Sequence, residues 1–237
     1  MRNTFLLFYL VLAFAVQGQE NIQFAGRKDY LKEVQSELLK EWPKNRTINL
    51  VFHGHSVPAG YFKTPVVNTL EAYPFQLLKL LKALYPVAVI NIINTSVGGE
   101  NSESGARRFE TEVLVHRADV LFIDYALNDR RIGLEGAAKA WESMIEKALK
   151  MNIKVILLTP SPDQKVNIAE PGNLLEQHAV QIRRLAEKYG TGLVDSYQLF
   201  HQVVMKGDSI THYMSQVNHP NEKGHLLIAN EILTYFH

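Results

Sequence analysis

The sequence predicts an α/β protein with three layers, in which a parallel β-sheet lies between two layers of helices. Short apolar segments alternate five times with longer segments whose apolar residues recur every three or four positions. These are the patterns of buried strands and amphipathic helices, and their regular alternation favours a parallel sheet with helices on both faces. The chain has 237 residues, 46% of them hydrophobic and 21% charged. Because these values are ordinary for a globular protein, and neither repeats nor long linkers interrupt the pattern, we expect one α/β/α domain.

The first half of the chain is expected to contain two helices and two strands. A helix over residues 28–42 has apolar residues at helical spacing and ends before a proline. The run over residues 47–54 is rich in β-branched and apolar residues and predicts a buried strand. An irregular stretch over residues 57–69 separates this strand from a helix over residues 75–84. The strand that follows, over residues 87–93, is almost wholly apolar, and we expect it to be covered on both faces.

The second half continues the same alternation. The predicted elements are a polar helix over residues 104–116, a strand over 119–125, a helix over 134–151, a strand over 153–159, a helix over 173–190, a short strand over 192–195 and a closing helix over 222–235. Asn173 and Glu176 resemble a capping box at the start of one of these helices, and Gly190 is a typical residue at its end.

Residues 1–18 have the pattern of a secretory signal peptide. Arg2 is followed by an apolar run over residues 5–16 and then by small residues that suit a cleavage site. The run is too short to span a bilayer, which takes about 20 residues. A buried N-terminal strand or an uncleaved anchor is the alternative. We expect residues 19–237 to form a single secreted or periplasmic domain without stable membrane insertion.

Charge and composition exclude several classes of function. The formal net charge is +1, without a dense run of lysine and arginine, so nucleic acid is not an expected partner. The chain has no cysteine, which excludes disulfide bonds, thiol nucleophiles and cysteine-rich zinc sites.

Four strand-end loops carry residues suited to acyl transfer. Ser56, Gly99, Asn128 and His219 all lie in loops expected at the carboxyl edge of the sheet, where open parallel sheets bind ligands. Acyl transfer needs a nucleophile, a base and donors for the developing oxyanion. Ser56 has the hydroxyl to attack, and His219 can accept its proton. The backbone N–H groups of Ser56 and Gly99 and the side-chain amide of Asn128 can donate to the oxyanion.

The order and spacing of these four loops resemble the SGNH (GDSL-type) hydrolases. The resemblance lies in the Gly-His-Ser run that ends at Ser56, the Asn-Thr-Ser-Val-Gly-Gly loop that ends at Gly99, the Ala-Leu-Asn-Asp run around Asn128 and the Asn-His-Pro run around His219. It implies a flavodoxin-like, five-stranded parallel sheet and cofactor-free ester hydrolysis through an acyl-enzyme. It also implies that Ser56 is the nucleophile, that Gly99 and Asn128 are oxyanion donors, and that His219 is the base.

Three positions depart from the family pattern. His55 replaces the aspartate of the name-giving motif, and Ala126 replaces a glycine, which matters little unless φ is positive there. The third residue before His219 is usually aspartate but here is Gln216, which has no negative charge to stabilise an imidazolium. We expect Gln216 to orient His219 through its amide, unless a neighbouring backbone carbonyl or the carboxylate of Asp195 does so.

The resemblance and the signal peptide together favour release of small acyl groups, most of all O-acetyl groups on carbohydrate. The residues expected to contact such a substrate are His55, Tyr61, Glu100 and Arg130. A lipid-type esterase or lysophospholipase is the alternative enzyme. A carbohydrate-binding domain that kept the fold but lost catalysis is the alternative of a different class, because Gln216 replaces the family's acid.

A metal site is the remaining alternative. His53 and His55 form a His-x-His pair that would share one face if the strand continued. No carboxylate in a matching loop completes a ligand set, so we expect neither a metal nor another cofactor.

Overall fold

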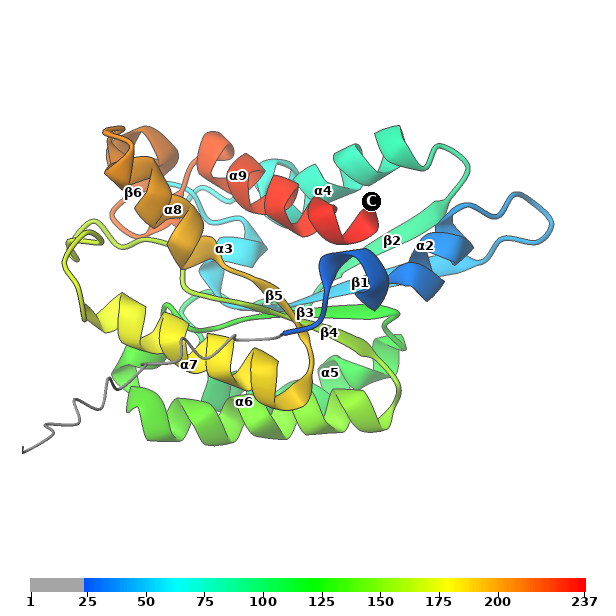
Figure 1. Cartoon of the computed structure of the whole chain (residues 1–237), viewed down its shortest axis with the longest axis horizontal. Coiled ribbons are helices and arrows are strands. Elements are labelled where there is room, and N and C mark those ends of the chain that lie inside the picture. The colour runs from blue at the N-terminus through cyan, green and yellow to red at the C-terminus, as the bar shows by residue number, and fades with distance from the viewer. Residues whose placement is uncertain (1–23) are drawn as a thin grey trace, which may run out of the picture.

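The computed structural model describes residues 24–237, which form a five-stranded parallel sheet between two layers of helices (Figure 1). The strand order is β2-β1-β3-β4-β5, and every neighbouring pair is parallel. The strands are β1 (Thr47–Gly54), β2 (Val89–Asn94), β3 (Val120–Asp124), β4 (Lys154–Leu158) and β5 (Gly192–Val194). The predicted α/β/α class with a flavodoxin-like sheet is confirmed. The predicted signal peptide lies outside the described residues.

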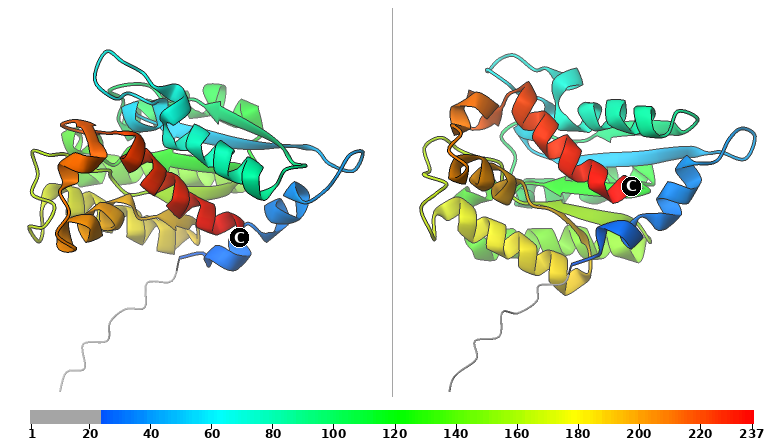
Figure 2. Two further views of the ribbon diagram at one scale, coloured as in Figure 1. Left: turned by 90° about the horizontal axis from the view of Figure 1, so that it is seen from above. Right: turned by 45° about the horizontal axis from the view of Figure 1, so that its top comes forward.

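Two groups of helices cover the two faces of the sheet (Figures 1 and 2). One face is covered by α2 (Lys32–Leu38), α4 (Tyr73–Leu84), α8 (Ser196–Met205) and α9 (Glu222–Leu233). The opposite face is covered by α5 (Ser102–Glu112), α6 (Gly133–Lys150) and α7 (Leu174–Tyr189). The short helix α1 (Arg27–Tyr30) precedes α2, and α3 (Ser56–Ala59) lies at the end of β1. Within residues 24–237, no helix is both long and apolar enough to span a membrane.

The apolar core depends on the central strands β1 and β3, whose side chains alternate between the two layers. Phe52 and Phe122 are directly paired in the sheet and stack with ring centroids 4.4 Å apart on the side of α4 and α9. Val51 and Leu121, the preceding residues, pack on the side of α5 and α6. Burying a side chain of this size contributes about 1.5–3 kcal/mol. The central strands therefore hold both layers and fix the position of the loops that follow them.

The edge strand β2 differs from expectation. We expected it to be covered on both faces, but none of its residues is fully buried, and Val89 is 48% exposed. The cause is the strand order, which places β2 at one edge of the sheet. An apolar run shows that a segment is extended, but it does not show how many neighbours the strand has.

Helix boundaries differ from expectation mainly near the N-terminus. The single helix expected over residues 28–42 is divided at Leu31, and its second half ends at Leu38. Trp42, which fitted the helical spacing, is 84% exposed. Two helices were not expected, α3 and α8, although Tyr197, Phe200 and Val204 of α8 have helical spacing.

The expected caps of α7 are present. Asn173 Oδ1 accepts a hydrogen bond of 3.0 Å from the N–H of Glu176, and Gly190 ends the helix with a φ of 60°. The carboxylate of Glu176 accepts from the N–H of Gly172, one residue earlier than in a capping box.

A two-stranded antiparallel hairpin lies outside the main sheet. It consists of β6 (Met214–Gln216) and β7 (His219–Pro220), and its register pairs Gln216 with His219. Sequence patterns gave no sign of these short strands. They bring residue 216 beside the ring of His219.

We predict that the stability of the fold falls in mild acid because three histidines are buried. Burial lowers the pKa of His53 and of His178 to about 4 and that of His225 to about 3. The unfolded rings titrate near 6.5, so below pH 6.5 the unfolded state binds protons that the folded state does not. The free energy of unfolding should fall by about 1.4 kcal/mol per pH unit for each such histidine until the folded ring titrates.

His178→Leu tests this prediction. Both ring nitrogens of His178 are buried without a hydrogen-bond partner in the described part of the chain, so leucine removes an unsatisfied polar group. Thermal unfolding at pH 7.5 and pH 5 should show a smaller loss of Tm in the variant than in the wild type. Equal losses in both proteins would show that His178 does not couple protonation to unfolding.

Candidate active site

Ser56 stands at the carboxyl end of β1, where the chain turns into α3. β1 ends at Gly54, where an added Cβ would lie 2.4 Å from the carbonyl oxygen of Asp124 on the neighbouring strand. Only glycine allows β1 to approach β3 this closely. The chain then turns at His55, whose Nδ1 caps α3 by accepting from the N–H of Val57 at 3.2 Å. Ser56 is consequently the first residue of α3, and its N–H has no acceptor within that helix.

The strand order places this end of β1 where a crevice between loops is expected. The chain goes from β1 to β2 on one side and then returns to β3 on the other side. At such a topological switch point, the loops after the two strands separate and leave room for a ligand. Ser56 lies at the switch point of this sheet.

His219 makes direct contact with Ser56. Its Nε2 lies 2.9 Å from Ser56 Oγ, which is hydrogen-bonding distance. The two residues are 163 positions apart in the chain, and β7 carries the histidine to the end of β1. Ser56 is 7% exposed and His219 is 6% exposed, so the pair lies at the surface without being open to bulk water.

The other ring nitrogen of His219 lies near one hydrogen-bond acceptor and one hydrogen-bond donor. Nδ1 lies 2.9 Å from the carbonyl oxygen of Phe62, which can only accept, and 2.7 Å from Nε2 of Gln216, which can only donate. The amide of Gln216 is fixed in this orientation because its Oε1 accepts from the N–H of Thr64 at 3.1 Å.

This geometry assigns the orienting contact to Phe62. When Nδ1 carries the proton it donates to the Phe62 carbonyl, and Nε2 is then free to accept a proton from Ser56. The Gln216 amide instead favours the tautomer with the proton on Nε2, which faces Ser56. Two of our alternatives are thus corrected. Asp195 is bound to Arg183 at 2.6 Å and caps α8, and the orienting carbonyl is not the one next to Gln216.

The surroundings lower the pKa of His219. Burial is the largest cause and the nearby His55 adds to it, while the carbonyl of Phe62 partly offsets both. Because the pKa is below the ordinary value of 6.5, the ring is neutral at neutral pH, as a proton acceptor must be.

The loop after β2 places Gly99 beside the end of β1. Val97 N–H donates to the carbonyl of Gly54 at 3.0 Å, which ties this loop to the strand that precedes Ser56. Gly99 has a φ of 79°, and no atom would meet a Cβ added there within 4 Å. We expected glycine at this position because it permits close approach of the backbone. The structure gives a different reason, namely that the left-handed conformation favours glycine.

Asn128 is attached to the same loop from the end of β3. Its Nδ2 donates to the carbonyl of Glu100 at 2.8 Å, and the side chain is almost fully buried. One amide hydrogen therefore fixes the side chain, and Nδ2 carries a second. Ala126, two residues earlier, does not have a positive φ, so the absence of the family's glycine has no consequence there.

Glu100 supports this loop through its carboxylate. Its carboxylate forms two hydrogen bonds with Arg108, of 2.8 and 2.6 Å, and accepts a third from the hydroxyl of Tyr125 at 2.9 Å. Both carboxylate oxygens are thus bound to α5 or to the residue that follows β3. The side chain thus anchors the residue that follows Gly99, and the expected role of Glu100 in substrate binding stays a prediction.

His55 is not placed to contact a substrate. Its side chain is fully buried, with Nδ1 bound to the N–H of Val57 and Nε2 3.4 Å from the carboxylate of Asp124. His53 lies elsewhere, against Thr95 and the ring of Tyr125. The two histidines do not share a face because β1 ends between them. Within residues 24–237, no group of three or more histidines and carboxylates is placed to hold a metal.

Tyr61 and Arg130, the other two residues expected to bind substrate, lie beside the site. The ring of Tyr61 is 6.1 Å from that of His219 and packs against Gly98. Arg130 lines a cavity of about 340 Å³ that also includes Asn128. Arg131, which follows Arg130, also lines this cavity. Asp163 and Lys165 line it too but were not anticipated, because the loop after β4 has no motif that indicates a site.

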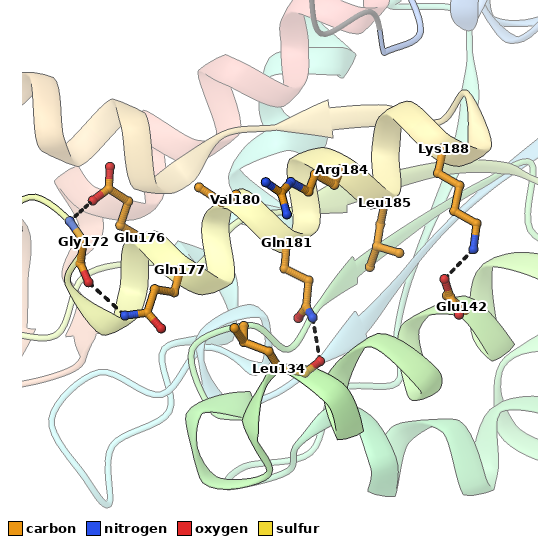
Figure 3. A pocket seen from close by; sticks show the side chains of 10 residues that line it. All are labelled: Leu134, Glu142, Gly172, Glu176, Gln177, Val180, Gln181, Arg184, Leu185 and Lys188. Carbon is orange, nitrogen blue, oxygen red and sulfur yellow. Dashed lines mark hydrogen bonds and ion pairs between the residues drawn. The ribbon is translucent and has the colours of Figure 1, made fainter. Parts of the chain in front are cut away.

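A second cavity, of about 600 Å³, lies between α6 and α7 (Figure 3). Leu134, Val180 and Leu185 give it an apolar floor, and an ion pair of 2.6 Å between Lys188 and Glu142 lies at one end. None of the residues around it belongs to the loops that carry Ser56, Gly99, Asn128 or His219. The smaller cavity, which is lined by Asn128 and by Val217 and Asn218 just before His219, is the one that borders the loops of the candidate active site.

Known proteins share sequence similarity with this chain. The model of the GDSL-like Lipase/Acylhydrolase family matches residues 52–227. An acetylxylan esterase of Geobacillus stearothermophilus is 21% identical over 192 residues, which is 76% of this chain and 86% of that protein. An uncharacterized lipoprotein of Bacillus subtilis, YqeF, is 33% identical over 81 residues, but these cover only 31% of this chain and 33% of that protein.

Solved structures share the fold. Axe2, an acetyl-xylooligosaccharide esterase from Geobacillus, superposes with a TM-score of 0.70 at 21% identity, over 80% of this chain and 94% of that chain. A two-domain esterase active on acetylated mannans has a TM-score of 0.72 at 22% identity, over 87% of this chain and 52% of that chain. Catalytic mutants of Axe2 replace a serine, a histidine and an aspartate, and the aspartate precedes the histidine by three residues. Gln216 has this spacing from His219.

We predict that Gln216→Glu increases activity. The substituted carboxylate has the same length, keeps the hydrogen bond from Thr64 and replaces a donor to Nδ1 by a negatively charged acceptor. It should stabilise the imidazolium, raising kcat by about tenfold or more toward that of a full triad. It should also raise the pKa of His219, so the acidic limb of kcat/KM, which lies below pH 6.5 in the wild type, should move to higher pH.

Gln164→Glu is the matched control, because it adds the same charge to a residue that contacts the backbone of Gln216 but not His219. It should leave kcat nearly unchanged. A loss of activity in Gln216→Glu would show that the amide itself is required.

A further prediction concerns Asn128. If its amide donates to the oxyanion, Asn128→Ala should lower kcat by about 10²–10³ with little change in KM, as is typical for the loss of one donor. Steady-state kinetics with a soluble aryl ester measure both quantities. An effect confined to KM would make Asn128 a residue that positions the substrate.

Proposed function

Since this chain belongs to the GDSL-like lipase/acylhydrolase family and is a carboxylic ester hydrolase, we propose that it removes O-acetyl groups from carbohydrate through Ser56 and His219. The observation that carries the proposal is the contact of 2.9 Å between Ser56 Oγ and His219 Nε2. The lowered pKa of His219 supports it, since the ring must be neutral to accept the serine proton.

In the first half of the proposed reaction, Ser56 Oγ attacks the carbonyl carbon of the ester while its proton passes to Nε2 of His219. The N–H groups of Ser56 and Gly99 and the Asn128 amide donate to the oxyanion. The imidazolium is held by its Nδ1–H, which donates to the Phe62 carbonyl. Collapse of the intermediate breaks the C–O bond to the sugar, and Nε2–H returns the proton to the departing sugar oxygen.

In the second half, water attacks the acetyl group on Ser56. His219 takes a proton from this water and then returns it to Ser56 Oγ as the acyl bond breaks, so acetate leaves and the enzyme is restored. The same ring acts as base and acid in each half, which requires a pKa near or below the working pH.

The relatives are the reason for proposing that the acyl group is acetyl and that the substrate is a carbohydrate. The curated relative is described as an acetylxylan esterase, and the solved structures as esterases of acetylated xylo-oligosaccharides and acetylated mannans. The half-buried Tyr61 beside His219 suits this substrate, because aromatic rings commonly pack against sugars. We propose further that residues 1–18 direct export and that residues 19–237 act in the periplasm or outside the cell.

The non-catalytic alternative has one observation in its favour. The Gln216 amide donates to the ring nitrogen that a catalytic triad leaves protonated, so it opposes the productive tautomer. A binding domain derived from the family would show glycan binding without turnover. The proposed enzyme turns over because the Phe62 carbonyl offsets this effect.

We predict that Ser56→Ala abolishes ester hydrolysis without loss of stability, because the hydroxyl lies at a strand end and contributes little packing. 4-Nitrophenyl acetate and 4-nitrophenyl octanoate, compared at equal concentration, should be hydrolysed with a clear preference for acetate. A serine-directed phosphonate should label Ser56 in the wild type.

Three results would contradict this proposal. A preference for octanoate favours the lipid-type esterase. Full activity in Ser56→Ala removes Ser56 as nucleophile. The absence of turnover of either ester, together with binding of a glycan, favours the non-catalytic domain.

A further inference from the structure

The cavity beside Asn128 concentrates positive charge next to two loops of the candidate active site, those of Asn128 and His219. Three cationic side chains line it, those of Arg130, Arg131 and Lys165, against one carboxylate, that of Asp163. Three positive charges and one negative charge leave +2 in a cavity of about 340 Å³, whereas the whole chain carries only +1. The charge is thus a local feature of this cavity.

The single carboxylate of the cavity is already neutralised. Asp163 is 7% exposed, and its Oδ2 lies 2.7 Å from Nη2 of Arg130. Its Oδ1 accepts from the backbone N–H of Lys165 at 2.9 Å. Arg131 and Lys165 are exposed and form no ion pair within residues 24–237. These two cations are available to a ligand.

Both cations are attached to the elements that build the active site. Arg131 belongs to a 3₁₀ turn (Asp129–Arg131) that directly follows Asn128, and its N–H donates to the carbonyl of Asn128 at 3.2 Å. Lys165 lies on the loop after β4, which runs beside the hairpin of β6 and β7 (Figure 1). In that loop the N–H of Gln164 donates to the carbonyl of Val217 at 2.7 Å, two residues before His219.

From this arrangement we infer that the substrate is an acetylated saccharide that carries a carboxylate, as a uronic acid does, within one sugar unit of the acetyl group. The inference rests on the proposed function and names the substrate class for the same site. Asn128 and Asn218 join the cavity to the oxyanion region and to His219, so a group in the cavity lies next to the ester. A planar guanidinium and an ammonium at the rim suit a sugar carboxylate, and a cavity of this volume holds about one sugar ring.

The test compares two acetylated xylo-oligosaccharides of equal length, one neutral and one bearing a glucuronic acid beside the acetylated unit. For the wild type, kcat/KM should be about twofold to thirtyfold higher for the acidic substrate, the range expected for two exposed ion pairs. The preference should shrink as sodium chloride is raised from 20 to 500 mM. Arg131→Gln combined with Lys165→Gln should bring the ratio close to one.

Lys44→Gln is the matched control, because it removes one exposed cation from the loop before β1, at the opposite end of that strand from Ser56. This variant should have the same ratio of kcat/KM between the acidic and the neutral substrate as the wild type. Calorimetry with the Ser56→Ala protein and the deacetylated oligosaccharides should show the same preference in Kd, independently of turnover.

The outcomes separate this inference from the proposed function. Hydrolysis of 4-nitrophenyl acetate together with equal kcat/KM for the two oligosaccharides overturns the inference alone. If the double variant still prefers the acidic oligosaccharide, the inference is also overturned, because residues other than Arg131 and Lys165 then bind the carboxylate. If no ester is hydrolysed, the proposed function fails, and the calorimetric preference still decides whether the cavity binds a sugar acid.

Discussion

The close approach of β1 to β3 at Gly54 is the constraint on which the site depends. A Cβ at this position would lie 2.4 Å from the carbonyl oxygen of Asp124, so the two central strands can be neighbours there only with glycine. The N–H of His55 then donates to that same carbonyl at 3.2 Å, which turns the chain into α3 and presents Ser56. The core fixes this turn, because Phe52 and Phe122 stack two residues before the pair Gly54 and Asp124.

Nδ1 of His219 faces a backbone carbonyl, and the residue three positions before the histidine is a glutamine, not a carboxylate. The carbonyl of Phe62 is a neutral acceptor held by the backbone, so it can fix the tautomer but supplies only partial charge to an imidazolium. Burial also disfavours the imidazolium, because it lowers the pKa of His219 and so keeps the ring neutral in mild acid. In the proposed mechanism His219 is therefore a weak base, and its imidazolium is stabilised less than a carboxylate would stabilise it.

Two buried clusters hold the loops that carry the polar groups. Glu100, Arg108 and Tyr125 anchor the loop of Gly99 beneath the site, and Asp129 receives the N–H of Ser102 at 2.7 Å and the indole N–H of Trp141 at 2.6 Å. Carboxylates in both clusters are fully engaged inside the protein. Near Asn128 the charged side chains of the cavity that form no ion pair within residues 24–237 are two cations, Arg131 and Lys165.

The sequence by itself determined the class of fold and the set of candidate residues. Apolar runs and helical spacing are local properties of the sequence, so the five strands of the main sheet were placed within two residues of their ends. Four strand-end loops indicated Ser56, Gly99, Asn128 and His219. The tertiary structure decided what each residue touches. Strand order made β2 an edge, and the end of β1 between His53 and His55 separated two histidines that a continued strand would place on one face. The partner of His219 is a backbone carbonyl of Phe62, a group present in every residue, so no side-chain motif marks it and only the folded chain brings it to the ring.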